Sequence, residues 1–155
     1  MKSAQTCAAL ALIATGLSAL PHEAARAAEE AGAVLPDIVY GHKDGLALTM
    51  DLFRPPGDAN GGTILFMISG GWYSRWAPPQ ETQRVFQPYL DVGYNVFAVR
   101  HGSSPRYSIP EAIVDVQRAV RFVRIHADQW DVEAERLGVM GISWGPSLFG
   151  PRHRG

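Results

Sequence analysis

The sequence has little cysteine, no long run of strongly apolar residues and no excess of charge of either sign. Cys7 is the only cysteine, so a disulfide within the chain is excluded. A net charge of −1 and 19% charged residues give no sign of a surface for nucleic acid or for an anionic membrane. Nothing indicates a metal or another cofactor. We expect one domain, or part of one, that acts on a small molecule.

The first 27 residues have the composition of an export signal. Lys2 precedes the apolar run 8–20, and small residues follow up to Ala27. The run falls short of the about 20 strongly apolar residues that a bilayer span needs. We therefore expect cleavage after Ala27, export to the periplasm or beyond, no stable membrane anchor, and a flexible leader over residues 28–36. The alternative is a retained amphipathic helix.

Four segments of the mature chain before residue 137 predict strands. Residues 37–42 and 46–54, joined by a turn at 43–45, predict an antiparallel hairpin, because apolar residues alternate in the second segment. Residues 63–68 and 94–100 are continuous apolar runs, which are typical of strands covered on both faces.

Two segments between these strands predict helices. The first covers residues 80–92, ends at Gly93 and has a break or kink at Pro88; its inward residues are Val85, Phe86 and Leu90. The second opens with a capping box, Ser108 to Glu111, and runs to about Gln129. Its predicted inward stripe is Ile113, Val116, Val120, Val123 and Ala127, and its predicted solvated face is Arg118, Arg121 and Arg124. Alternating strands and helices predict a parallel sheet with helices on its faces.

Residues 137–145, Leu-Gly-Val-Met-Gly-Ile-Ser-Trp-Gly, join a short apolar run to the spacing Gly-x-Ser-x-Gly. This is the pattern of a nucleophile elbow, in which a strand turns sharply into a helix with the serine, here Ser143, at the tip. Side chains at Gly141 or Gly145 would collide with the neighbouring strand or helix in so tight a turn. Taken alone, the spacing also occurs by chance.

A second candidate element follows the strand at 63–68. Gly70 and Gly71 let the backbone aim N–H groups at a ligand, as an oxyanion hole requires, although an ordinary turn has the same composition. Trp72, Tyr73 and Trp76 come next. They form either an aromatic platform for a sugar or phenolic substrate or a lid packed on the core, and we favour packing.

These features occur together with Thr-Met-Asp-Leu-Phe-Arg-Pro at 49–55, the helical segment 115–124 and Arg-Leu-Gly-Val-Met-Gly at 136–141. In this combination the chain resembles the N-terminal half of a secreted bacterial α/β-hydrolase of the esterase and lipase branch. It is most similar to feruloyl and acetyl-xylan esterases and to hormone-sensitive-lipase-like enzymes. That family's His-Gly-Gly-Gly appears here as Ile-Ser-Gly-Gly at 68–71, without the histidine.

The resemblance implies an α/β-hydrolase fold over residues 37–145, with a mostly parallel sheet and an N-terminal antiparallel hairpin, cut off after the elbow. It also implies hydrolysis of a carboxylic ester through an acyl-enzyme formed on Ser143. The amide of Trp144 and that of Gly70 or Gly71 would stabilise the oxyanion. Trp72 and Tyr73 would contact the substrate, for which a plant cell-wall acyl sugar is one candidate.

The base and the acid that such a serine needs follow the nucleophile in this fold. Residues 146–155 contain no Asp or Glu, and His153 is poorly placed to serve as a fixed base. We interpret His42 and His101 as loop residues and His126 as a helix-surface residue, none of them in a triad. We therefore expect this chain to be inactive as it stands.

Residues 146–155 also break the helix that an elbow should lead into, because they include Pro146, Gly150 and Pro151. Synonymous codons for this stretch can be chosen that, read one base later, encode an apolar helical sequence. We therefore expect a shifted reading frame here; a true short C-terminus or an unrelated fusion is the alternative. The competing function is a non-catalytic secreted fragment or a carbohydrate-binding module.

Overall fold

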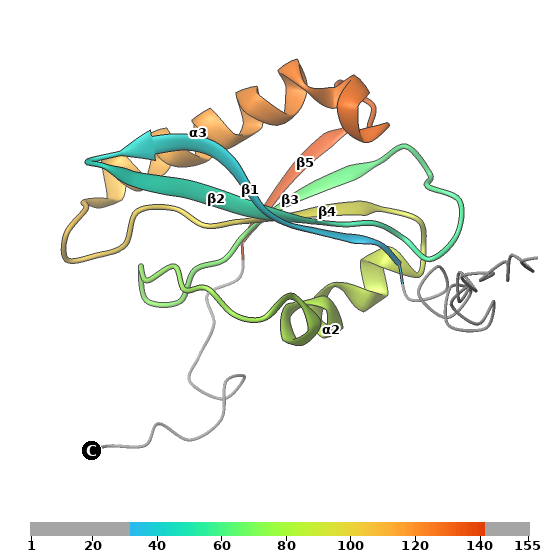
Figure 1. The fold of residues 1–155 in the computed structure, drawn as a ribbon, viewed down its shortest axis with the longest axis horizontal. Coiled ribbons are helices and arrows are strands. Elements are labelled where there is room, and N and C mark those ends of the chain that lie inside the picture. Colours follow the sequence, from blue (N-terminus) through green and yellow to red (C-terminus); the bar gives the residue numbers. More distant parts are fainter. Residues whose placement is uncertain (1–31, 142–155) are drawn as a thin grey trace, which may run out of the picture.

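The computed structural model describes residues 32–141, which form a five-stranded sheet with α2 below it and α3 above it (Figure 1). The predicted signal at 1–27 and the segment 142–155, including Ser143, Trp144 and Gly145, lie outside this part of the chain. The elements in chain order are β1 (Val34–Lys43), β2 (Leu46–Phe53), β3 (Thr63–Met67), α2 (Pro79–Leu90), β4 (Asn95–Val99), α3 (Ile109–Ile125), η1 (Ala127–Trp130) and β5 (Leu137–Gly141).

The strand order is β1-β2-β4-β3-β5. β1 pairs antiparallel with β2, β2 pairs antiparallel with β4, and β3 pairs parallel with both β4 and β5. The predicted hairpin and parallel sheet are confirmed. The three parallel strands end at the same edge, and the loops after β3 and β4 lead to helices on opposite faces. In open α/β sheets, that arrangement marks the position where ligands bind.

Side chains that alternate along the strands supply two cores, one under each helix. Phe97 and Val99 of β4 belong to the core on the α3 side, whereas Val96 and Ala98 belong to the core on the α2 side. On the α2 side, Phe86 of the helix packs edge-on against the rings of Phe53 and Phe66, with centroids 5.1 and 5.0 Å away. Burial on both faces accounts for the continuous apolar runs of β3 and β4.

β1 begins at Val34, three residues before the predicted start at Asp37, so residues 34–36 of the predicted leader are part of the sheet. The pairing of β1 with β2 is irregular between Leu35 and Ile38. Within this bulge Asp37 has a φ of 53°, and its N–H donates to the Asp51 carboxylate at 2.8 Å. The Asp51 carboxylate thus accepts a hydrogen bond from a backbone N–H that has no partner in the pairing of β1 with β2.

The first helix has nearly the predicted bounds, but Pro88 does not break it. α2 runs from Pro79 to Leu90 with Pro88 inside. Because the helix ends two residues later, the missing N–H falls in its last turn, where little of the helix remains to be disturbed. Gly93, with a φ of 88°, follows as the predicted stop.

The second helix is shorter than predicted, and its inward stripe is confirmed in part. α3 ends at Ile125, and the single 3-10 turn η1 takes its place from Ala127. Ile113, predicted to face the sheet, is 52% exposed. Val123 is buried as predicted, and Val116 and Val120 are partly buried against the core, but Ala112, Asp115 and Ala119 of α3 are buried as well. The buried face of α3 is thus wider than the predicted stripe and includes the carboxylate of Asp115.

The prediction that Arg118 lies on the solvated face of α3 is also wrong. Its guanidinium donates to the His42 carbonyl at 3.1 Å, and its side chain crosses β1 at Gly41, where a β-carbon would come within 2.6 Å of Arg118 Cδ. Arg121 and Arg124 are exposed, as predicted.

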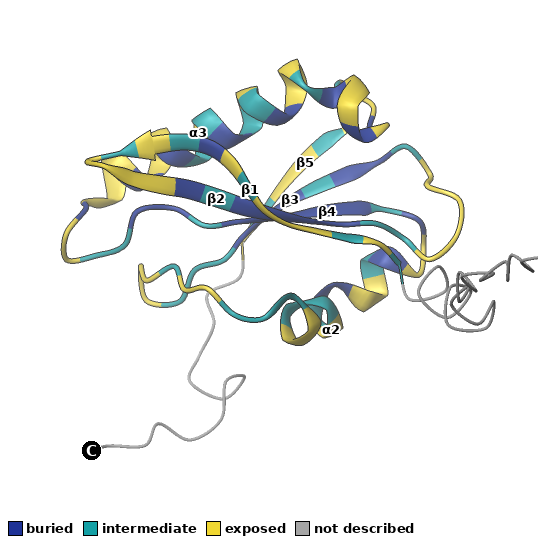
Figure 2. Cartoon of the chain, viewed as in Figure 1, coloured by how far each residue is buried: buried dark blue, intermediate teal, exposed yellow. Residues whose placement is uncertain are grey.

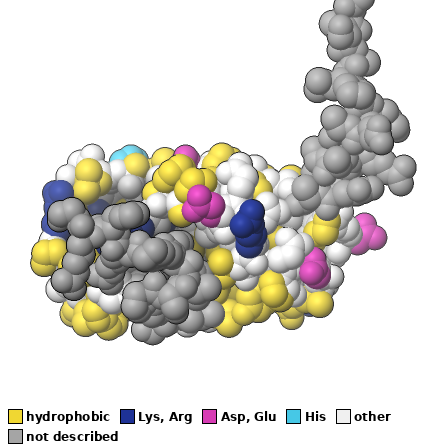
Figure 3. Space-filling model, turned by 90° about the horizontal axis from the view of Figure 1, so that it is seen from below, with side chains coloured by type: hydrophobic (Ala, Val, Ile, Leu, Met, Phe, Trp, Pro, Cys, Tyr) yellow, Lys and Arg dark blue, Asp and Glu magenta, His cyan; other side chains and the backbone are white. Residues whose placement is uncertain are grey.

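β5 lies at the edge of the described sheet and is more exposed than β3 or β4 (Figure 2). Val139 is 56% exposed, because among the described strands β5 has a neighbour on one side only. Seen from the α2 side, the described surface carries hydrophobic side chains in several separate places, with Lys and Arg sparse (Figure 3). Within residues 32–141, neither helix has the length and apolar content that a membrane span requires.

Candidate active site

The pairing of β3 with β5 brings the two predicted catalytic elements to one edge of the sheet. Met67, the last residue of β3, is the register partner of Gly141, the last residue of β5. Gly70 and Gly71 follow Met67 by three and four positions, and Ser143 follows Gly141 by two. Adjacent strands lie about 4.8 Å apart. The chain therefore leaves the sheet toward Ser143 directly beside the chain that leads to the glycines.

Residues 70–73 form a tight turn. Gly70 and Tyr73 exchange two backbone hydrogen bonds of 2.9 and 3.1 Å, and Gly71 and Trp72 between them have φ values of 58° and 68°. Two positive φ angles in succession are the geometry of a type I′ turn. The Gly70 N–H is thus occupied by the Tyr73 carbonyl. The hydrogen bonds of the described residues include none from the Gly71 N–H, which makes Gly71 the better candidate donor of the two.

The aromatic residues after the turn do not pack on the core. Trp72, Tyr73 and Trp76 are 54%, 46% and 59% exposed. The interpretation of a packed lid is therefore wrong. Trp72 also has a left-handed backbone, with a φ of 68°, which costs a bulky residue about 1–2 kcal/mol. These side chains are available to contact a bound molecule.

The loop after β4 is fastened to this turn. The Ser104 N–H donates to the Trp72 carbonyl at 3.0 Å. Ser74 and Ser103 are joined twice, by the Ser74 N–H to Ser103 Oγ at 2.8 Å and by Ser103 Oγ–H to the Ser74 carbonyl at 3.1 Å. The loops that follow β3 and β4 therefore form one connected wall at the edge of the sheet.

The three histidines of the described segment have different environments. His42 belongs to β1 and not to a loop. His101 lies in the predicted loop but is only 8% exposed, and its Nδ1 is 2.8 Å from the Gly102 carbonyl, so Nδ1 carries a proton. His126 caps α3 and lies on the ring of Phe122, with centroids 4.3 Å apart. Its position in a polar loop did not indicate that His101 is buried.

Arg100 at the end of β4 fixes the strands beneath the site. Its guanidinium donates to both oxygens of Asp51 at 2.7 and 2.8 Å, and its Nε–H donates to Thr49 Oγ1 at 2.9 Å. Asp51 is 1% exposed. Because both partners come from the Thr-x-Asp segment of β2, this segment has a structural role that sequence analysis did not assign. Tyr40 adds a bond from its hydroxyl to the Arg100 carbonyl at 2.6 Å, and burial raises the pKa of Tyr40.

Asp115 of α3 holds the first residues of the loop after β4. Its Oδ2 accepts from the Gly102 N–H and from Lys43 Nζ, each at 3.0 Å, and Asp115 is 1% exposed. A buried carboxylate needs such partners, since an unpaired charge in this position is costly. At the start of α3 the predicted capping contact is confirmed: the Ser108 N–H and O–H donate to Glu111 at 2.8 and 2.7 Å. These bonds lower the pKa of Glu111.

Gly141 does not have the close contacts that the motif suggested. A β-carbon there would meet only Met67 Cβ at 3.8 Å, an ordinary contact, and Gly141 is not among the residues with positive φ. The expected collision with the neighbouring strand is therefore wrong; the helix side of the elbow lies outside the described residues. Residues 32–141 hold no group of three side chains that could bind a metal ion.

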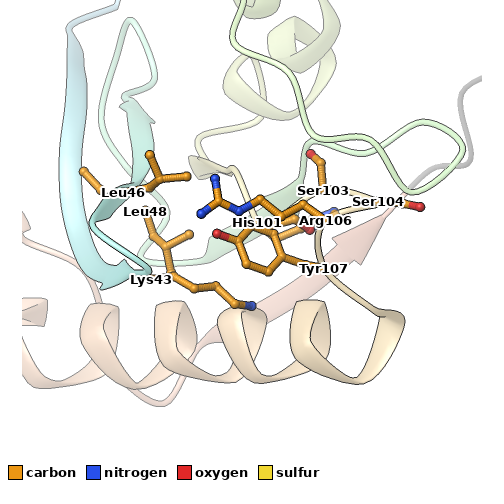
Figure 4. Close-up of a pocket in the computed structure, with 10 residues that line it drawn as sticks. Lys43, Leu46, Leu48, His101, Ser103, Ser104, Arg106 and Tyr107 are labelled. Carbon is orange, nitrogen blue, oxygen red and sulfur yellow. Dashed lines mark hydrogen bonds between the residues drawn. The ribbon is translucent and has the colours of Figure 1, made fainter.

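A pocket of about 330 Å³ opens beside the turn, between the β1–β2 hairpin and the loop after β4 (Figure 4). Its lining is formed by Lys43, Leu46, Ala47, Leu48, His101, Gly102, Ser103, Ser104, Arg106 and Tyr107. Ser104 both lines this pocket and holds Trp72, so the pocket and the glycine turn share a wall.

A mixed sheet in this strand order, with a helix on each face and a serine motif after its edge strand, is the fold of an α/β-hydrolase. The chain belongs to the BD-FAE family, whose family model matches residues 50–149. This confirms the resemblance to esterases of the α/β-hydrolase fold.

Individual relatives agree with this assignment. Ethyl acetate hydrolase of Pseudomonas putida is 31% identical over 116 residues, which are 74% of this chain and 36% of the relative. The probable carboxylic ester hydrolase LipM of Mycobacterium tuberculosis is 29% identical over 114 residues, 72% of this chain and 26% of the relative. The solved structure of a truncated carbohydrate esterase from gut microbiota has a TM-score of 0.62 at 23% identity and covers 74% of this chain and 41% of that chain. This chain therefore spans well under half the length of the curated relatives it matches.

Proposed function

We propose that this chain carries the nucleophile half of a carboxylic ester hydrolase, with Ser143 as the nucleophile. The observation that supports this most is the pairing of Met67 with Gly141, because it directs the glycine turn and the serine motif to the same edge of the sheet. The named relatives are ester hydrolases, which supports the same class of reaction.

In the proposed reaction, Ser143 Oγ attacks the ester carbonyl and forms an acyl-enzyme, which water then hydrolyses. A histidine must accept the serine proton and an acid must orient that histidine. The negative oxygen of the tetrahedral intermediate accepts hydrogen bonds from the amides of Gly71 and Trp144. Loss of one such donor costs about 10²–10³ in rate.

The exposed aromatic residues support a platform for the substrate. Trp72 and Tyr73 lie on and beside the turn that holds the candidate donor, and both are about half exposed. Flat aromatic faces suit the apolar faces of sugars and phenolic rings. We propose that they contact the alcohol or acyl part of a small-molecule ester, with a cell-wall acyl sugar as the leading candidate. The export pattern of residues 1–27 supports action outside the cytoplasm.

We further propose that these 155 residues alone do not turn over esters, because no Asp or Glu follows Ser143 within them. The test compares this chain with a form extended to the length of its relatives, using a fluorophosphonate probe and mass spectrometry of the labelled peptide. We expect labelling of Ser143 in the extended form and little in the 155-residue chain. Labelling of another serine in the extended form would refute the assignment of the nucleophile.

A further inference from the structure

The charged residues that line the pocket beside the glycine turn are both cations. Lys43 and Arg106 are both among its lining residues, and no Asp or Glu is. The Lys43 ammonium is already paired with Asp115 at 3.0 Å. Arg106 takes part in none of the ion pairs formed by residues 32–141. Its guanidinium therefore has its donors available for an anion.

Tyr107 supplies a second donor to the pocket. The residue is 8% exposed, and its hydroxyl is buried with no hydrogen-bond partner among the described residues. A buried hydroxyl without a partner costs about 1–3 kcal/mol, so its position calls for an acceptor that residues 32–141 do not provide. Figure 4 shows the hydroxyl pointing toward the side of the pocket where the Arg106 guanidinium lies.

The Tyr107 ring is held in place by cations on both sides. Lys43 Nζ lies 4.4 Å from the ring centroid and the Arg106 guanidinium carbon lies 5.3 Å from it. Figure 4 shows the ring between the two side chains. Contacts of this kind favour this arrangement of the ring and the two cations. The two donors are therefore preorganised as a pair.

The hairpin side of the pocket is apolar, whereas His101, Ser103 and Ser104 line the loop side. Leu46, Ala47 and Leu48 of β2 line it from the hairpin side, and Leu48 is 6% exposed. A volume of about 330 Å³ is at the small end of the range for ligand pockets. Its occupant would thus have a compact apolar body with one group that accepts hydrogen bonds and carries negative charge.

We propose that this pocket binds the carboxylate of a small, otherwise apolar molecule through Arg106 and the Tyr107 hydroxyl, with its body against the Leu46–Leu48 wall. Because Ser104 joins the pocket to Trp72 of the glycine turn, the pocket is a subsite for esters that carry a second, free carboxylate. The binding site stands on the geometry alone, whereas its use as a substrate subsite rests on the proposed ester hydrolysis.

Binding of benzoate and of the neutral isostere benzamide, followed by isothermal titration calorimetry, tests the site without any turnover. We expect benzoate to bind more tightly than benzamide, and Arg106→Gln or Tyr107→Phe to weaken benzoate binding about tenfold, as expected for a hydrogen bond to a charged group. Tyr107→Phe keeps the ring and its packing, and Arg84→Gln, an exposed arginine of α2, is the matched control. Equal binding of the two probes, or benzoate binding that neither variant changes, would overturn the proposal.

Turnover separates this inference from the proposed function. In the form extended to the length of its relatives, 4-nitrophenyl hydrogen succinate carries a free carboxylate and 4-nitrophenyl butyrate does not. We expect Arg106→Gln to raise KM for the succinate ester about tenfold and to leave the butyrate ester unchanged. Equal effects on both esters would overturn the subsite. Benzoate binding without turnover of either ester would overturn the proposed function and leave the carboxylate site standing.

Discussion

Met67 and Gly141 are register partners at the ends of two adjacent parallel strands, β3 and β5. The tight turn at 70–73 and the Gly-x-Ser-x-Gly motif both begin within four residues of this pair. A nucleophile and a backbone donor that act on one carbonyl must lie about 3 Å from it on different sides. Neighbouring strands meet this need, because each supplies one group to the same edge.

Trp72 has a left-handed backbone that a bulky residue adopts only at a cost. Asparagine tolerates this conformation better, so we expect Trp72→Asn to be more stable than Trp76→Asn by about 1 kcal/mol. Trp76 is the matched control because it is equally exposed and has no positive φ. Urea unfolding of both variants measures the difference. Equal stabilities, or a less stable Trp72→Asn, would contradict strain at this turn.

The Arg100–Asp51 pair joins β4 to β2 with a bidentate contact and is almost fully buried. Asp51→Asn removes the buried counter-charge of the guanidinium and leaves only the exposed Asp37 carboxylate, 3.1 Å away, so we expect a loss of about 3 kcal/mol in the free energy of unfolding. Asp58→Asn, at an exposed loop position, should change it by less than about 0.5 kcal/mol. Chemical denaturation gives both values. A loss at Asp51 no greater than that at Asp58 would mean that the pair does not hold the strands together.

Glu111 stabilises the start of α3 only while it is ionised. Its pKa is lowered by the bonds from the Ser108 N–H and O–H, so its contribution is fully present above the unfolded value of about 4.3 and is lost as the pH falls through the lower folded value. We expect Glu111→Gln to lower Tm at pH 7 and the difference from wild type to shrink below about pH 4. Glu135→Gln, at an exposed site, is the control. If the difference in Tm between Glu111→Gln and wild type did not change with pH, the ionised carboxylate of Glu111 would not be what stabilises the start of α3.

The sequence predicted the strands and helices well because their signals are local. Continuous apolar runs identified β3 and β4, and the serine-to-glutamate spacing identified the start of α3. The position of β4 between β2 and β3 has no such signal, since it depends on pairing between distant segments. The burial of Asp115 on α3 has the same origin. Asp115 is buried because Lys43 and Gly102, distant in sequence, provide its partners.

The candidate site was predicted in part. The glycine pair and its aromatic neighbours stood out by composition, but their hydrogen bonds did not. Only the structure shows that Gly70 donates to Tyr73 and that the loop of Ser103 and Ser104 is fastened to the turn. The pocket of Arg106 and Tyr107 was missed because the hairpin supplies its apolar wall from residues nearly 60 positions earlier in the chain. The roles predicted for Ser143 and Trp144 remain proposals.

The most direct test of the account is turnover of 4-nitrophenyl acetate by Ser143→Ala in the form extended to the length of its relatives. We expect kcat/KM to fall at least about 10³-fold with the unfolding transition unchanged, because oxyanion and binding contributions alone leave only a small residual rate. Ser108→Ala, a surface serine at the start of α3, should retain nearly full activity. Activity of Ser143→Ala close to that of Ser108→Ala would contradict the assignment of the nucleophile and, with it, the site at the edge of β3 and β5.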